Sequence, residues 1–222
     1  MLKHQPKNKA KKNSLTTGLR YNLAMAISFL IGIDEVGRGC LAGPLLVVAA
    51  RQQTILPDGL ADSKTLVRGQ REGLFPALVK ACDFGEGWVS SSEIDRRGLA
   101  QAMRLGVARA LRSLGAKPHD KIIMDGPFNY LPKVYKNVEC LIDADALVPL
   151  VSVASIYAKV RRDRFMIELA ARHKRYGFEN HVGYYTRQHK EALDNFGPLR
   201  RIHRTSFRPV KLMNATILVK SV

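Results

Sequence analysis

The sequence predicts an α/β domain with a mixed central sheet flanked by helices, plus a small C-terminal helical part. Short apolar runs typical of buried strands come first, and later ones alternate with longer segments whose apolar residues recur at helical spacing. The final stretch, 177–222, is strongly basic and shows only loops and short helical patterns, with no core of its own. We therefore expect three parts: a disordered basic tail (1–19), a main domain (20–176) and the C-terminal part (177–222).

Two apolar strands are expected first. The run from Leu23 to Ile33 leads into Asp34, and residues 45–50 (LLVVAA) form a second buried strand, joined to the first through Gly43-Pro44. The short connection favours an antiparallel pair. A polar, turn-rich segment (58–65) follows.

The sequence pattern predicts the remaining helices and strands with differing clarity. Glycines and a proline weaken the helical pattern that follows residue 65. The later elements are expected in this order: a strand over 84–90, a helix from the capping-box-like Ser92 and Asp95 to Gly115, strands over 121–124 and 138–142, and a long helix from Pro149 to about Tyr176, ended by Gly177.

The stretch Ile31–Cys40 (IGIDEVGRGC) carries the clearest sign of a functional site. Two adjacent carboxylates, Asp34 and Glu35, stand where a buried strand ends, and an ionised carboxylate beside a core is costly unless it is paired or bound to metal. The loop Gly37-Arg38-Gly39 follows at once. Its glycines allow close approach of a ligand to the backbone, and its arginine is a forked donor suited to phosphate.

The charge balance points to a polyanionic partner. Lysine and arginine number 36 against 19 acidic residues, a formal net charge of +17, which favours nucleic acid over the alternative of a merely solvated basic surface. Three scattered cysteines without a CxxC pair are typical of a reduced, cytoplasmic protein. No apolar run is long enough for a membrane helix, and the faint likeness of the N-terminus to a signal peptide lacks a convincing cleavage site.

Four acids share one position in the pattern: Asp34, Glu35, Asp125 and Asp145 each stand at or just past the end of an apolar strand. Ligands of open α/β sheets gather at such ends, and Mg²⁺ or Mn²⁺ suits carboxylate ligands. Two ions about 4 Å apart would serve phosphodiester hydrolysis. The alternative is that some of these acids are turn residues or helix caps; Asp143 competes with Asp145, and we interpret Asp143 as structural.

Other chemistries find little support. Gly32 to Gly39 does not fit a P-loop, and no serine or thiol nucleophile stands out. The six histidines lack metal-ligand spacing. His181 and His189 could face the site from the C-terminal part, although a surface position is the simpler expectation.

Six motifs, each weak alone, follow the order found in one known family: DEVGRG at 34–39, DSK at 62–64, DG at 125–126, ASI-x-AK-V-x-RD at 154–163, GY at 183–184 and HR-x-SF-x-PV at 203–210. Together they resemble ribonuclease HII, the type 2 ribonuclease H, from about Gly32 to Val210.

The resemblance implies a ribonuclease H-like fold and a Mg²⁺- or Mn²⁺-dependent endoribonuclease. Such an enzyme hydrolyses the RNA strand of RNA–DNA hybrids, incises 5′ of single ribonucleotides in duplex DNA, and leaves 5′-phosphomonoesters. The C-terminal part would then bind substrate. Because no interface stripe is apparent in the sequence, a monomer is expected.

The resemblance also implies roles for particular residues. The family's four catalytic, metal-binding acids fall on Asp34, Glu35, Asp125 and Asp145. Its loop that contacts the 2′-hydroxyl at the RNA-to-DNA junction falls on Gly37, Arg38 and Gly39, and its junction-sensing tyrosine falls on Tyr184. Lys64 is expected to contact the phosphate backbone. A packing role for Tyr184 and a solvated Lys64 are the alternatives.

Four positions depart from the family pattern. Ala61 and Pro127 replace common asparagines, and Asp143 and Val182 replace common lysines. The four acids are untouched, so we expect an active enzyme. A non-catalytic or weakly active hybrid-binding paralogue is the alternative, and a DNA endonuclease or integrase-like enzyme on a related fold is a third reading.

Overall fold

The structure, a computed structural model, describes residues 28–60 and 66–213. The expected basic tail (1–19), Lys64 and Ala61 lie outside these described residues. None of the helices in the described ranges is long and apolar enough to cross a bilayer.

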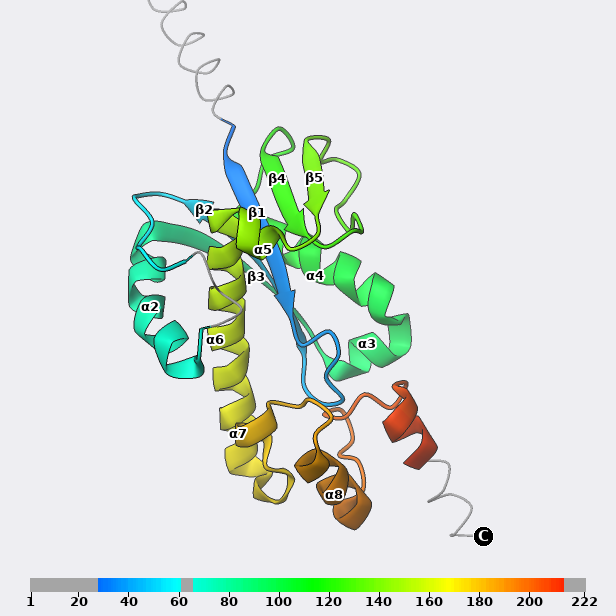
Figure 1. Ribbon diagram of the computed structural model, residues 1–222. Helices are drawn as coiled ribbons and strands as arrows, with labels where there is room; N and C mark the ends of the chain where they lie inside the picture. The colour runs from blue at the N-terminus through cyan, green and yellow to red at the C-terminus, as the bar shows by residue number, and fades with distance from the viewer. Residues whose placement is uncertain (1–27, 61–65, 214–222) are drawn as a thin grey trace, which may run out of the picture.

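A mixed five-stranded sheet forms the centre of the molecule, in the order β3-β2-β1-β4-β5 (Figure 1). Its strands are β1 (Leu30–Val36), β2 (Leu45–Gln52), β3 (Cys82–Val89), β4 (Lys121–Asp125) and β5 (Val138–Leu141). As expected, β1 and β2 are antiparallel, whereas β1 and β4 are parallel. The predicted α/β class with a mixed sheet is confirmed.

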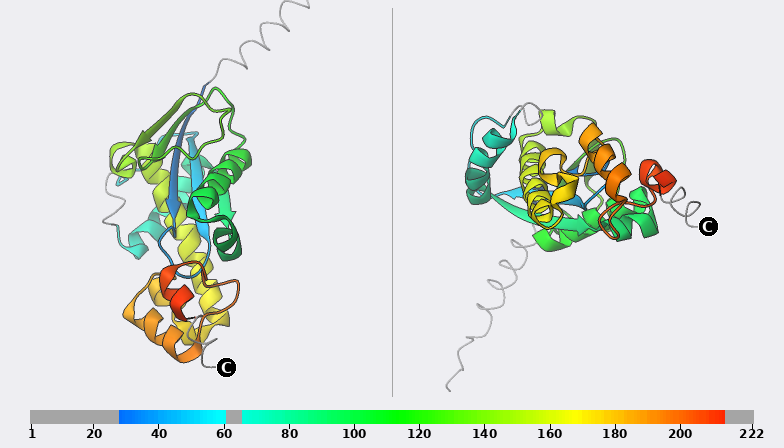
Figure 2. Two further views of the ribbon diagram at one scale, coloured as in Figure 1. Left: turned by 90° about the vertical axis from the view of Figure 1, so that its right-hand side faces the viewer. Right: turned by 90° about the horizontal axis from the view of Figure 1, so that it is seen from below.

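Helices cover both faces of the sheet (Figure 2). α4 (Leu99–Leu114) packs on one face against β2 and β3, and α6 (Pro149–Arg172) packs on the other against β1 and β2. The alternation of side chains along β1 serves both layers: Ile31 and Ile33 join the apolar cluster on the α4 side, and Val36 joins the cluster on the α6 side.

The weak helical signal after residue 65 proves to be a helix, α2 (Arg68–Ala81), which includes Pro76. By contrast, the single helix expected to end at Gly115 is two helices, because Gly98 has a φ of 76° and separates α3 (Ser91–Arg97) from α4. The capping box also lies just before the expected pair, between Ser90 and Glu93.

The long helix α6 is shorter than expected. It ends at Arg172, and a 3₁₀ turn, η1 (Lys174–Tyr176), follows before Gly177 turns the chain with a φ of 65°. The expected stop at Gly177 is therefore the end of η1 and not of the helix itself.

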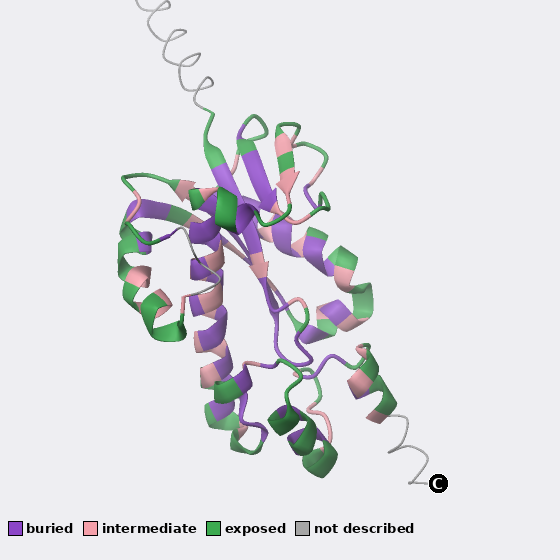
Figure 3. Cartoon of the chain, viewed as in Figure 1, coloured by how far each residue is buried: buried purple, intermediate pink, exposed green. Residues whose placement is uncertain are grey.

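The C-terminal part packs around a hydrophobic cluster that it shares with the main domain, in agreement with the expectation that it has no core of its own. α7 (Phe178–His181) and α8 (Arg187–Phe196) pack beside the last turns of α6. The cluster between them contains the following buried residues: Leu41, Ala42, Met166, Leu169, Ala170, Tyr176, Phe178, Ala192, Leu193 and Val210. Figure 3 shows buried positions continuing along α6 from the sheet into this region. The apolar residues are too scattered in sequence for periodicity to reveal them, and the division at residues 176 and 177 stays a prediction.

Candidate active site

The carboxyl ends of β1 and β4 lie side by side. The two strands are parallel, and Ile33 pairs with Met124, which places Asp34 and Asp125 next to each other at the same edge of the sheet. This adjacency comes from the register of two apolar strands that are far apart in sequence.

Asp34 lies on the face of the sheet that α6 covers and is 8% exposed. Burial raises the pKa of its carboxyl well above the usual range, and the nearby charges of Glu35 and Asp125 raise it further. The Ser155 side chain on α6 offers a hydrogen bond that opposes part of this increase. The ionised form of Asp34 therefore lacks sufficient positive charge around it.

Glu35 points to the opposite face, toward Arg38. Its Oε1 lies 3.4 Å from Arg38 Nη1, and Arg38 Nη2 lies 3.4 Å from the hydroxyl of Tyr130. Burial raises the pKa of Glu35; Arg38 lowers it in part, and Asp125 raises it again. Its Oε2 is buried and accepts no hydrogen bond from the residues that the structure describes.

Asp125 is linked to the short helix that carries Asp145. Asp125 Oδ1 accepts a hydrogen bond of 2.7 Å from the Ala144 N–H, which ties the end of β4 to α5 (Ala144–Leu147). Asp145, the next residue, is 4% exposed and lines a cavity of about 590 Å³ together with Leu60 and Ser152. Asp143 occupies the N-cap position of α5 in a left-handed conformation with a φ of 58° and makes no capping hydrogen bond with its side chain.

The acids form an open group. Within residues 28–60 and 66–213, no three histidine, cysteine or acidic side chains are arranged to enclose an ion by themselves. Asp34, Glu35 and Asp125 nonetheless influence one another electrostatically. A cation at this edge would relieve their mutual repulsion.

Two buried arginines, which the sequence did not mark as functional, pack against the loop Gly37-Arg38-Gly39. Gly37 has a φ of 87°, and a Cβ on it would lie 2.2 Å from Nε of Arg162. Arg204 donates hydrogen bonds to the carbonyl oxygens of Gly37 and Arg38 at 2.7 and 2.9 Å. Both arginines fall in the motifs quoted above, but a buried cation has no distinctive sequence pattern.

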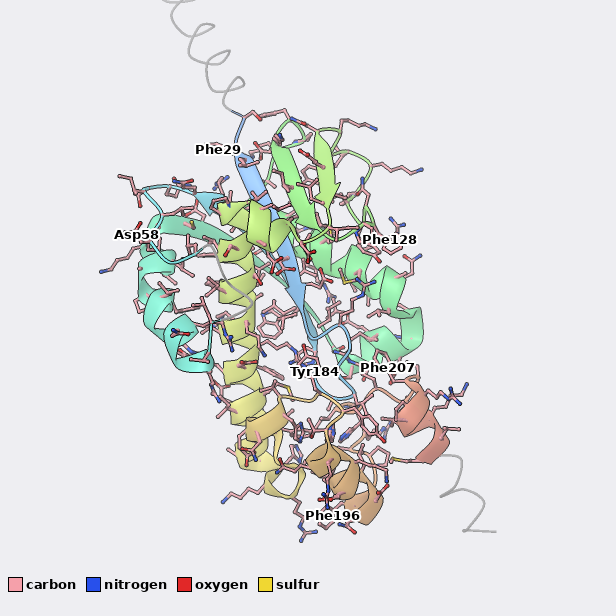
Figure 4. The ribbon with its side chains drawn as sticks, viewed as in Figure 1. Phe29, Asp58, Phe128, Tyr184, Phe196 and Phe207 are labelled. Atoms are coloured by element: carbon pink, nitrogen blue, oxygen red, sulfur yellow. The ribbon has the colours of Figure 1, made fainter. Side chains whose placement is uncertain are left out.

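Tyr184 lies near this loop (Figure 4), because Leu41 N–H donates a 2.9 Å hydrogen bond to the carbonyl of Gly183. Tyr184 is 40% exposed, and Lys159 Nζ lies 5.8 Å from the centroid of its ring. Burial raises the pKa of the Tyr184 hydroxyl, and the neighbouring Cys40 thiol, which hydrogen-bonds to it, raises it further. Tyr184 thus presents part of its ring to solvent while its hydroxyl is anchored.

The histidine expectations were wrong. His181 and His189 are neither on the surface nor directed at the acids: they are 6% and 0% exposed and lie inside the C-terminal part, with His203 beside them. Val182 stands where the family pattern commonly has lysine. Its φ is 43°, which is unusual for a β-branched residue.

The family model and the curated relatives agree on one family, and solved structures share its fold. A family model described as ribonuclease HII matches residues 31–210. A ribonuclease HII from Parvibaculum lavamentivorans is 39% identical over 212 residues, covering 94% of this chain and 78% of the relative. The crystal structure of ribonuclease H2 from Pyrococcus horikoshii OT3 has a TM-score of 0.67 and 26% identity over 85% of this chain and 98% of its own. Bst-RNase HIII, solved in complex with Mn²⁺, shares the fold with a TM-score of 0.62 and 20% identity over 85% of this chain and 70% of its own.

Proposed function

This chain belongs to the ribonuclease HII family and is a ribonuclease H enzyme, and from this premise we propose its substrates and its catalytic residues. The proposal is that it hydrolyses the RNA strand of RNA–DNA hybrids and incises 5′ of single ribonucleotides in duplex DNA. One observation supports it most: Asp34, Glu35 and Asp125 lie together at one edge of the sheet, and the first two have raised pKa values.

The residues present fit a divalent cation. Hard carboxylate oxygens suit Mg²⁺ or Mn²⁺, the raised pKa of Asp34 indicates missing positive charge, and Oε2 of Glu35 is buried without a hydrogen bond in the described part of the chain. We propose that Asp34, Glu35, Asp125 and Asp145 hold the ions, two of them once substrate is bound. Bound there, the ions would supply an activated water and would stabilise the leaving oxygen.

The open arrangement of the acids fits this assignment. Mg²⁺ is commonly held by one or two carboxylates together with waters and substrate phosphates, and rarely by a cage made only of protein. A site without a preformed three-ligand group among the described residues would then be completed by the scissile phosphate. The carboxylates of the chain would bind and orient, and the substrate itself would contribute to metal affinity.

Recognition of the ribonucleotide is assigned to the loop and the tyrosine. The 2′-hydroxyl is the group by which a protein distinguishes RNA from DNA. We propose that Gly37, Arg38 and Gly39 contact it, and that the exposed part of the Tyr184 ring stacks on the following sugar, which lacks it. The contact of Lys64 with phosphate stays a prediction, as do a monomeric state and a cytoplasmic location.

Three duplexes test the proposal: an RNA–DNA hybrid, DNA with one ribonucleotide, and DNA alone, each with Mg²⁺, Mn²⁺ or EDTA. We expect both ribonucleotide-containing substrates to be cut with either ion, the second on the 5′ side of the ribonucleotide, and EDTA to stop cleavage. Binding without cutting would favour the hybrid-binding alternative, and equal cutting of DNA alone would favour the DNA endonuclease. Either result overturns the proposal.

A further inference from the structure

Three histidines lie together in the interior of the C-terminal part. His181 ends α7, His189 belongs to α8, and His203 lies on the segment after α8; none is more than 6% exposed. The rings of His181 and His189 stack with centroids 4.4 Å apart, and Nε2 of His189 lies 3.0 Å from Nε2 of His203. The proposed chemistry uses none of them.

The hydrogen bonds determine which nitrogen carries the proton in two of the rings. The Leu199 N–H donates to Nδ1 of His203 at 2.8 Å, so a neutral His203 carries its proton on Nε2. The carbonyl of Tyr184 lies 2.8 Å from Nδ1 of His189, so that nitrogen must be the donor and Nε2 the acceptor. A single direction results: Leu199 donates to His203, His203 to His189, and His189 to Tyr184.

His181 holds the other side of the same peptide. Its Nδ1 accepts from the Gly183 N–H at 3.2 Å, and its Nε2 lies 2.9 Å from the carbonyl of Tyr176, to which it donates. Gly183 has a φ of 90°, and a Cβ there would lie 2.3 Å from the carbonyl oxygen of Ala42. Gly183 and Tyr184 are therefore held on both sides by imidazole rings and in front by the segment that follows the Gly37–Gly39 loop.

This series of hydrogen bonds requires neutral rings, because a charged imidazole has no acceptor nitrogen. Burial lowers the pKa of His189 to about 4 and that of His203 to about 3. At neutral pH each ring therefore keeps the one donor and one acceptor that the geometry uses.

We propose that His189 and His203 are positioning residues, which fix the main chain of Tyr184 and so set the preference for single embedded ribonucleotides over long hybrids. The inference rests on the proposed role of the Tyr184 ring. His189 hydrogen-bonds to the carbonyl of Tyr184, and His203 acts on it through His189. The carbonyl and the ring of Tyr184 share one Cα, so a shift of one displaces the other. A shift of about 1 Å in a substrate-contacting group can cost on the order of 100-fold in rate.

A double-mutant cycle tests it, with the ratio of kcat/KM for single-ribonucleotide DNA to kcat/KM for a long hybrid as the readout. His189→Phe keeps an aromatic ring but removes both hydrogen bonds. In the wild-type background we expect this ratio to fall about tenfold. In the Tyr184→Ala background the carbonyl remains but the ring is gone, so His189→Phe should change the ratio less than about twofold. Stability should fall equally in both backgrounds.

A conservative variant supplies the control. His189→Asn places an amide donor near the position of Nδ1 and should retain most of the ratio, whereas His189→Gln, whose amide lies farther along the side chain, should not. An unchanged ratio for His189→Phe, or equal falls in both backgrounds, would overturn the inference. Failure of the proposed function looks different: the wild-type enzyme would not cut, or Tyr184→Ala alone would leave the ratio unchanged.

One measurement on the unaltered protein does not depend on variants that fold. Long-range ¹H–¹⁵N correlation spectra report the protonated nitrogen of each histidine. We expect Nδ1–H on His189 and Nε2–H on His203 at neutral pH. The opposite assignment for either ring would overturn the inference whatever the cleavage data show.

Discussion

Arg204 donates a hydrogen bond from Nη2 to the carbonyl oxygen of Gly37 over 2.7 Å. The same fully buried guanidinium also donates to the carbonyls of Arg38 and Gly43. Burial lowers its pKa to about 10, so it stays charged at neutral pH. Through the guanidinium of Arg204, the C-terminal part thus supports the loop that is proposed to contact the 2′-hydroxyl.

Arg204→Lys should reveal how much this support matters. A lysine ammonium cannot reproduce the planar fork, so carbonyls of the loop would lose partners, and we expect a loss of about 1–3 kcal/mol in the free energy of unfolding. Urea titration measures it. Arg187→Lys, on a 93% exposed side chain, is the control and should change stability by less than about 0.5 kcal/mol. Equal effects of the two substitutions would contradict the argument.

Asp34→Asn should separate catalysis from folding. Removal of an acid that acts in the transition state should lower cleavage by at least about 100-fold while hybrid binding persists. Because the pKa of Asp34 is raised, its charge destabilises the metal-free fold at neutral pH, so the variant should melt higher in EDTA. Asp194→Asn, on the exposed face of α8, should change neither quantity. Undiminished turnover of Asp34→Asn would refute the metal assignment.

Tyr184→Ala should reduce cleavage of single-ribonucleotide DNA more than cleavage of long hybrids. A long hybrid offers many scissile positions and depends less on one RNA-to-DNA junction. Tyr185→Ala is a matched control, because Tyr185 is also exposed, at 49%. Steady-state kinetics on both substrates measure the effect, and an equal loss on both would argue against junction sensing.

Glycines should differ sharply in their tolerance of a methyl group. Gly183→Ala places a Cβ 2.3 Å from a backbone oxygen at a φ of 90°, so we expect a loss of more than about 1 kcal/mol. Gly73→Ala, in the exposed interior of α2 with nothing within 4 Å, should gain about 0.5–1 kcal/mol. Urea titration of both variants tests the contrast; if Gly183→Ala proves neutral, the turn at Tyr184 is less constrained than the distances indicate.

Acid should destabilise the protein through its buried histidines. The folded pKa values of His189 and His203, about 4 and about 3, lie below the ordinary 6.5. Between those values the unfolded chain binds more protons, so stability falls as pH decreases from about 6.5 toward 4, by about 2 kcal/mol per ring at pH 5. Protonation of Asp34 and Glu35, whose folded pKa values are raised, stabilises the fold as pH decreases and opposes the histidines. The readout is therefore the difference between the wild type and His189→Phe, measured by urea unfolding at pH 7.5, 6 and 5; the variant should lose the contribution of one ring. An unchanged slope in His189→Phe would contradict burial of a neutral His189.

Strand patterns and adjacent motifs predicted much of this molecule, for clear reasons. The apolar runs around Ile33 and Met124 are local signals, and their parallel pairing brings Asp34 beside Asp125 as expected of strand ends. The fold class and the family follow from such short stretches. The roles of the four acids, of the loop and of Tyr184 stay predictions that the experiments above address.

What the sequence did not predict depends on distant partners. The break at Gly98 was missed because the apolar spacing of α4 alone does not mark where α3 ends. Burial of Arg204 and His203 depends on carbonyls and rings supplied by other segments. In the sequence alone, both residues are indistinguishable from ordinary polar side chains. Charged and polar residues placed inside a small helical region are the part that pattern analysis cannot locate.

α6 carries one further consequence. Near its start Ser155 reaches Asp34, and farther along Arg162 reaches the carbonyl of Pro44 and the turn at Val182. These two anchor points lie about two helical turns apart, roughly 10 Å along the axis. The helix therefore sets the distance between the acids proposed to hydrolyse the phosphodiester bond and the turn proposed to recognise the sugar. Inserting one residue into the helix between Ser155 and Arg162 would rotate one anchor by about 100° relative to the other, so both contacts could not be kept.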